Sequence, residues 1–256
     1  MSRFYSHSLL IFALAISVFG MSTILMLALN PPTFHYDTVW RKPAVGLILA
    51  SICSAGILAA FVPKNCSNLL DRHEAYLRTS LVIEKAETKV CLEGHHPDCG
   101  QFTDHIIFVD NTAVCAACLG LAIGASTAML GTTAYFFFGV GLLPTSFHIM
   151  LIGQIAVAMG LAQFKLKGYA RLISNTLFVL GAFVIVLEID KLTENILCGI
   201  YSEGVVIIWI LTRTLLSQRD HWKICRDCMQ PCQIARAKKQ RLVSPPSSVE
   251  GAYDYQ

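Results

Sequence analysis

The chain has 256 residues, of which 54% are hydrophobic and 14% charged, and its formal net charge is only +3. Its mean hydropathy of +0.56 lies well above that of soluble globular domains, so the composition excludes an ordinary soluble protein and indicates an integral membrane protein. So small a charge, without a folded basic module, also argues against nucleic-acid binding.

Long uncharged apolar runs predict membrane-spanning helices, because about 20 apolar residues are needed to cross the hydrocarbon layer. The first run is longer than the apolar core of a signal peptide and ends without a small-residue cleavage motif, so we expect it to be a span. Residues 111–164 contain no charged side chain and are too long for one crossing, and Gly139, Gly141 and Pro144 mark a turn that divides them. The six predicted spans are residues 8–29, 43–63, 115–140, 145–164, 172–187 and 195–216.

Basic residues are concentrated on one side of these predicted spans. The amino-terminal segment, the loop at 64–114, the loop between the fourth and fifth spans and the tail carry most of the Lys and Arg residues. The opposite side has only Arg41, Lys42 and Lys191. Since basic residues beside spans stay in the cytoplasm, we expect both termini and the 64–114 loop on the cytoplasmic side of the cell membrane.

The loop at 64–114 is too long for a simple connection and too short to bury a core of its own, so we expect a bound metal to order it. Cytosolic thiols are kept reduced, which favours metal binding or redox chemistry over structural disulfides. The predicted parts of the chain are transmembrane helices 1 and 2 at 1–63, the cytoplasmic metal-binding loop at 64–114, transmembrane helices 3 to 6 at 115–217, and a basic, Cys-containing, partly disordered cytoplasmic tail at 218–256.

Within the loop, residues 105–114 carry β-branched and aromatic side chains on both sides of Asp110-Asn111, which predicts a β-hairpin. The hairpin would bring Cys115 and Cys118 beside an upstream segment rich in His and Cys, as in a zinc ribbon. A Cys-x2-Cys pair is a standard zinc half-site, and the start of a helix favours thiolates. The candidate metal ligands are His95, His96, Cys99, His105, Cys115 and Cys118, with Cys91 as a further candidate, and spacing does not fix which His completes a four-coordinate site.

These motifs also carry a family resemblance. Gly-His-His-Pro-Asp-Cys at 94–99, then His105, then Cys-Ala-Ala-Cys-Leu-Gly at 115–120 resemble the signature of an uncharacterised family of archaeal multi-pass membrane proteins. The resemblance covers residues 91–124 and implies a shared site in an archaeal membrane setting. It implies no reaction.

Other features have a structural and a functional interpretation each. Gly120 and Gly124 give the third predicted span a small-residue face, which indicates close helix packing in the bundle or self-association. Glu203 in the sixth predicted span is either hydrated near the outer head groups, with Glu188 and Asp190, or an intramembrane carboxylate with a proton or transport role. In the tail, the cysteines at 225, 228 and 232 form a second metal site, carry lipid as juxtamembrane cysteines, or are unpaired thiols.

The predicted fold class is an all-α integral membrane protein with about six transmembrane helices and a small zinc-ribbon-like cytoplasmic loop that contains a β-hairpin. No His-Glu-x-x-His motif, nucleophile elbow or phosphate loop occurs in the sequence. We therefore interpret zinc as ordering a loop with a structural or interaction role, in contact with the lipid bilayer and with a protein partner or a second copy of the chain. The alternatives are a membrane thiol–disulfide oxidoreductase that uses Cys115 and Cys118, and a membrane zinc enzyme with Glu93, Asp98 or Asp104 as the base.

Overall fold

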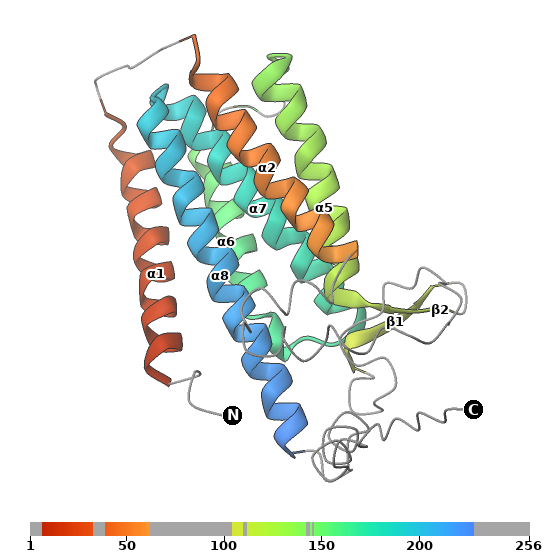
Figure 1. Ribbon diagram of the computed structural model, residues 1–256. Coiled ribbons are helices and arrows are strands. Elements are labelled where there is room, and N and C mark those ends of the chain that lie inside the picture. Colours follow the sequence, from red (N-terminus) through yellow and green to blue (C-terminus); the bar gives the residue numbers. More distant parts are fainter. Residues whose placement is uncertain are drawn as a thin grey trace, which may run out of the picture.

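The computed structural model describes residues 7–32, 39–61, 104–109, 112–141, 144 and 146–227. Over these ranges the chain is mostly helical, and a two-stranded sheet lies at one end of a helical bundle (Figure 1). The elements are α1 His7–Leu29, α2 Arg41–Phe61, β1 Ile106–Val109, β2 Thr112–Cys115, α5 Ala116–Thr132, the π-helical segment η2 Thr133–Phe137, α6 Phe147–Leu161, the 3-10 turn η3 Gln163–Lys165, α7 Gly168–Thr193 and α8 Ile196–Asp227.

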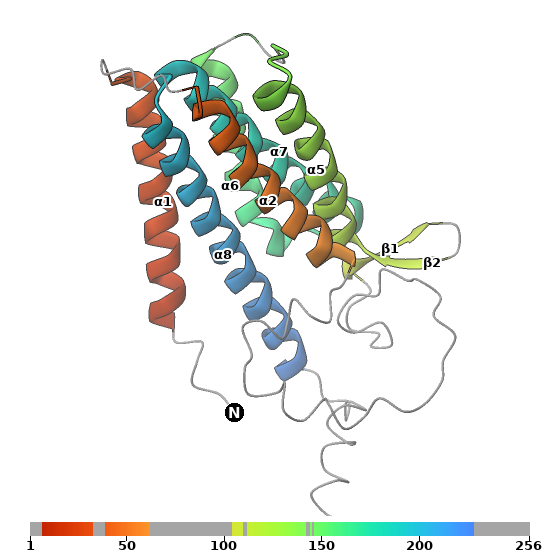
Figure 2. The same cartoon turned by 45° about the horizontal axis from the view of Figure 1, so that its top comes forward.

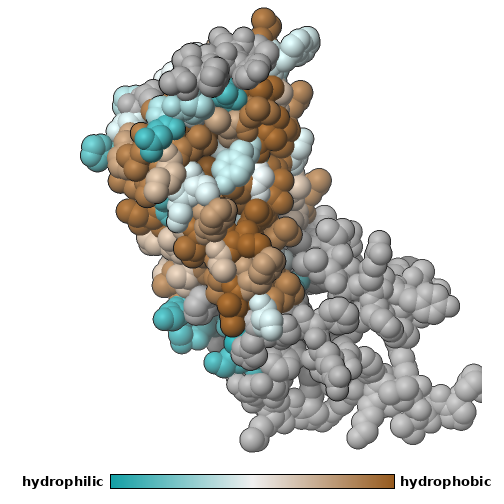
Figure 3. Space-filling model, turned by 90° about the vertical axis from the view of Figure 1, so that its left-hand side faces the viewer, coloured by the Kyte–Doolittle hydropathy of each residue, from teal (hydrophilic) through white to brown (hydrophobic). Residues whose placement is uncertain are grey.

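Five helices are long and apolar enough to cross a membrane, which confirms the prediction of a membrane-embedded protein. Large apolar side chains face outward from them, with Phe12 63%, Phe19 67% and Leu130 73% exposed, as expected of a surface that meets lipid. Figure 3 shows a mostly hydrophobic flank, with hydrophilic residues near its ends. The five candidate spans are Ser8–Leu29, Arg41–Phe61, Ala116–Phe137, Gly168–Thr193 and Ile196–Asp220.

The fourth predicted span, residues 145–164, is a shorter helix than expected. Helix α6 has 15 residues, or about 22 Å at 1.5 Å per residue, which is less than the thickness of the hydrocarbon layer. It begins late because Ser146 caps it, accepting a hydrogen bond from the backbone N–H of His148 at 3.2 Å. Length and composition therefore support five spans, and α6 packs against α7 as a sixth, shorter apolar helix.

The helices of the bundle alternate in direction. Figures 1 and 2 show that α1, α5 and α7 begin, and α2, α6 and α8 end, at the end of the bundle that carries the hairpin. We call this the hairpin end, and the other the far end.

Close contact between α5 and α7 depends on the predicted small-residue face. A Cβ atom on Gly120 would collide with the carbonyl oxygen of Leu172, and one on Gly124 would lie 2.9 Å from Cβ of Val179. The hydroxyl of Thr176 donates a hydrogen bond to the carbonyl oxygen of Gly120 at 3.1 Å. The small-residue face is therefore used for packing inside the bundle.

The predicted β-hairpin is confirmed. Strands β1 and β2 are antiparallel, with Ile106 opposite Cys115 and Val109 opposite Thr112. Asp110 and Asn111, on which the predicted turn depends, lie outside the described residues. Ile107 and Val114 are buried in one small cluster with Ala116, so the hairpin is docked on the base of α5 and α7. The zinc-ribbon fold of the surrounding loop stays a prediction, because residues 62–103 are not among those described.

Candidate functional site

Two thiols lie where the hairpin enters the bundle. Cys115 is the last residue of β2 and the N-cap of α5, and Cys118 lies one turn later. Both are half-buried and neither is in a disulfide. The ladder begins by pairing Ile106 with Cys115, so His105, directly before β1, lies at the same end of the hairpin. Strand β2 leads directly into α5, and this connection therefore fixes the position of the two thiols.

The surroundings of Cys115 favour its thiolate form. A hydrogen bond from the Cys118 thiol is the main cause that lowers the pKa of Cys115 to about 6. Burial raises this pKa, but hydrogen bonds from the backbone N–H groups of Cys118 and Ala117 and the positive charge of Arg171 lower it further. At neutral pH Cys115 is therefore mostly the anionic group that attacks disulfides or binds a metal.

His105 is held as a neutral imidazole. Burial is the main cause that lowers the pKa of His105 to about 4, and the charge of Arg171 lowers it further, against the opposing effect of Asp220 and Asp104. Its Nε2 atom lies 3.8 Å from Oδ2 of Asp220. A neutral imidazole is the form that binds zinc, so the protonation states of His105 and Cys115 both suit metal binding.

Arg171 links the hairpin end of α7 to α8, and the sequence did not reveal this role. Its side chain is 2% exposed, and its Nη2 atom lies 3.3 Å from Oδ2 of Asp220. Its Nε and Nη1 atoms have no hydrogen-bond partner among the described residues. From the sequence, Arg171 was interpreted only as one of the basic residues that indicate the cytoplasmic side. The signal that could have found it is helical spacing, since Arg171, Asn175 and Phe178 occupy one buried face of α7.

The predicted metal site is only partly within the described residues. His105, Cys115 and Cys118 are described, whereas His95, His96, Cys99 and the further candidate Cys91 are not. Across the described ranges, no group of three or more His, Cys, Asp or Glu side chains is arranged to hold a metal ion. The structure thus places the two thiols, and the zinc site stays a prediction that needs donors from residues 91–99. The tail cysteines at 225, 228 and 232 also lie outside what the structure describes in side-chain detail.

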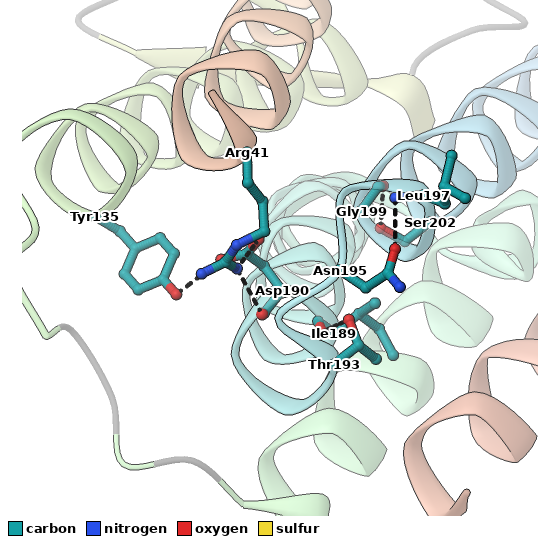
Figure 4. Close-up of polar contacts among 9 residues, drawn as sticks. All are labelled: Arg41, Tyr135, Ile189, Asp190, Thr193, Asn195, Leu197, Gly199 and Ser202. Atoms are coloured by element: carbon teal, nitrogen blue, oxygen red, sulfur yellow. Dashed lines mark hydrogen bonds and ion pairs between the residues drawn. The ribbon is translucent and has the colours of Figure 1, made fainter. Parts of the chain in front are cut away.

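A second polar cluster ties helices together at the far end of the bundle (Figure 4). Nη1 of Arg41 lies 2.6 Å from Oδ1 of Asp190 and 3.0 Å from its carbonyl oxygen. The hydroxyl of Tyr135, in the π-helical segment, donates to Oδ2 of the same carboxylate at 3.0 Å. Glu188 accepts from Lys191 at 3.1 Å and from the backbone N–H of Ser146 at 3.0 Å. Because both carboxylates are paired, the cluster is a structural connection between α2, α7 and η2.

Glu203 on α8 is different. Its side chain is 1% exposed, and neither carboxyl oxygen has a hydrogen-bond partner in the described part of the chain. Hydration near the outer head groups, one of the two interpretations of the sequence, is therefore not what the structure shows. Glu188 and Asp190 are also buried, each at 0% exposure, but both are paired.

Comparisons of the chain with protein-family models, curated proteins and solved structures found no match. A functional proposal has to be drawn from the residues themselves.

Proposed function

We propose that the chain is an integral membrane protein with a zinc site on its cytoplasmic side, in which the metal orders the 64–114 loop for a structural or interaction role. The observation that carries this proposal is the placement of Cys115 at the N-cap of α5 and of Cys118 in its first turn, directly after the docked hairpin. Two sulfur donors one helical turn apart form half of a tetrahedral zinc site on a rigid support.

The chemistry of the candidate donors supports zinc over harder cations. Thiolate sulfur and neutral imidazole nitrogen are preferred by Zn²⁺, whereas Mg²⁺ and Ca²⁺ prefer oxygen. The buried Arg171 also supports the proposal, because a zinc ion with three or four thiolates is anionic and a nearby cation offsets that charge.

One specific observation favours a second candidate function, thiol–disulfide exchange. The Cys118 thiol donates a hydrogen bond to Cys115, and the pKa of Cys115 is about 6, as in redox Cys-x-x-Cys motifs at helix starts. In that reaction the two thiols would lose two electrons and two protons as their disulfide forms, and a partner disulfide would be reduced to two thiols. A zinc enzyme with an open coordination position has no such observation among the described residues.

Metal analysis combined with X-ray absorption separates these functions. We expect purified wild-type protein to carry one zinc with sulfur ligands at about 2.3 Å. Cys115→Ser should lose the zinc, and Cys198→Ser should keep it, because Cys198 lies at the other end of the bundle on α8. Wild-type protein without stoichiometric zinc would overturn the proposal. A reversible disulfide between Cys115 and Cys118 in that metal-free protein would establish the second function instead.

A further inference from the structure

Glu203 lies inside the membrane-spanning part of the bundle. It comes seven residues after Ile196, the first residue of α8, which is about 10 Å along the helix axis. The candidate span of α8 runs from Ile196 to Asp220, so Glu203 lies well within it. An intramembrane carboxyl group needs a physical reason to be there, because its charge is costly in an apolar environment.

Glu203 lies in the interface between α8 and α2, as the contact of Gly199 with Val45 one helical turn earlier shows. A Cβ on Gly199 would lie 2.6 Å from Cγ2 of Val45, so α8 and α2 are in close contact there. Both helices run from the far end toward the hairpin end (Figure 1). One turn further along each helix, Glu203 comes beside the backbone of Leu49, whose side chain is 2% exposed. The carboxyl group therefore lies among tightly packed apolar side chains.

The charged groups of the neighbouring helices have partners of their own. The cations on α2 are Arg41, which is bonded to Asp190, and Lys42, whose Nζ atom lies 4.9 Å from the centre of the Tyr135 ring. On α7, Lys191 is bonded to Glu188. None of these cations supplies a hydrogen bond to Glu203. In the described part of the chain, the ionisable side chains of the far half of the bundle are those of Arg41, Lys42 and Cys53 on α2, Tyr135 on η2, His148 on α6, Glu188, Asp190 and Lys191 on α7, Glu194 at the end of α7, and Cys198 and Tyr201 on α8. Lys165, Arg171, Arg213 and Asp220 are nearer the hairpin end.

A carboxylate without a partner is unstable in an apolar interior, and either a metal cation or a proton could neutralise it. A metal cation would need several oxygen donors, and the described residues provide no group of three or more acidic, His or Cys side chains that could hold one. A proton needs no other donor. We propose that Glu203 is a proton-binding site in the membrane interior, with its carboxyl group protonated at neutral pH. The site is independent of the proposed zinc site at the hairpin end.

Infrared spectroscopy of the purified protein in lipid tests this proposal directly. We expect wild-type protein at pH 7 to show the carbonyl stretch of a protonated carboxylic acid, and Glu203→Gln to lose it completely. Glutamine has the size and neutrality of the protonated acid, so this variant should fold. The matched control is Glu194→Gln, which changes an exposed glutamate at the end of α7 and should leave the band intact. A wild-type protein without the band, or a band that persists in Glu203→Gln, would overturn the proposal.

Labelling with a hydrophobic carbodiimide gives a second, chemical readout, because the reagent reacts with protonated carboxyl groups. Peptide mapping should find the adduct on Glu203 and not on Glu194. Its yield should fall as the pH is raised and the proton leaves. Equal labelling of both glutamates, or a yield unaffected by Glu203→Gln, would contradict the assignment.

Discussion

At the scale of single residues, environment decides chemistry. Cys115 and Glu203 are both partly or fully buried acids, and burial alone disfavours the charged form of each. Around Cys115, a thiol donor, two backbone N–H groups and the charge of Arg171 outweigh burial and favour the anion. Neither carboxyl oxygen of Glu203 has a hydrogen-bond partner in the described residues, and this observation underlies the proposal of a neutral acid there.

The acidity of Cys115 predicts its reactivity in metal-free protein. Because the thiolate is the nucleophile and forms as pH rises through a pKa of about 6, alkylation of Cys115 by iodoacetamide should reach half of its maximal rate near pH 6. Cys118→Ala removes the largest cause of the low pKa, so the midpoint should move to higher pH. The measurement is mass spectrometry of the Cys115 peptide. A wild-type midpoint near the ordinary cysteine value, roughly 8.5, would contradict this prediction.

At the scale of elements, two devices fix how the helices pack. Glycine allows the backbones of α5 and α7 to approach, and the Arg41–Asp190–Tyr135 cluster joins α2, α7 and η2. The hairpin is positioned differently, by burial of Ile107 and Val114 against the base of these helices. The half-site at Cys115 is thus placed by the same contacts that hold α5 on α7.

Substitution of Gly120 tests the contact between α5 and α7. The methyl group of Gly120→Ala would collide with the carbonyl oxygen of Leu172, so we expect a loss of about 1–3 kcal/mol of stability, as for other overpacked positions. Gly204→Ala on α8 is the control, because a Cβ there meets nothing within 4 Å. Thermal unfolding in detergent would show the difference, and equal midpoints for the two variants would refute this account of the packing.

At the scale of the whole molecule, the two ends of the bundle differ in composition. The hairpin end carries the thiols, His105 and the Arg171–Asp220 pair, and the far end carries the Arg41–Asp190–Tyr135 cluster. Figures 1 and 2 place the start of α1 and the end of α8 at the hairpin end, which also carries the candidate site. The sequence assigns that side to the cytoplasm through its excess of Lys and Arg.

Cysteine labelling of intact cells tests this orientation. Val39, 92% exposed before α2, lies at the far end, and Lys167, with a side chain 73% exposed, lies at the hairpin end before α7. A membrane-impermeant maleimide should label Val39→Cys in intact cells, and Lys167→Cys only after permeabilisation, with sites assigned by peptide mapping. The reverse pattern would place the hairpin outside and would favour disulfide chemistry over zinc.

Periodicity and composition predicted those parts of the fold that depend on local sequence. Apolar runs located the helices, and β-branched residues around Asp110-Asn111 located the hairpin. Helix ends were less predictable: residues 172–187 became α7 Gly168–Thr193, because Arg171 and Asp190 find partners on other helices and so can be buried. Of the candidate site, the thiol pair was predictable from its spacing, whereas the contribution of Arg171 depended on a contact with α8.

The sequence by itself indicated that this chain enters a membrane and that its candidate metal ligands gather before and at the start of the third predicted span, since hydrophobicity and residue spacing are properties of the chain. Only the tertiary structure decided which ionisable groups are paired and which are alone. In the sequence, Asp190 and Glu203 look alike: both are acidic residues close to the outer ends of predicted spans. One meets the guanidinium of Arg41 and the other meets the packed face of α2, because partner and burial depend on how distant helices are brought together.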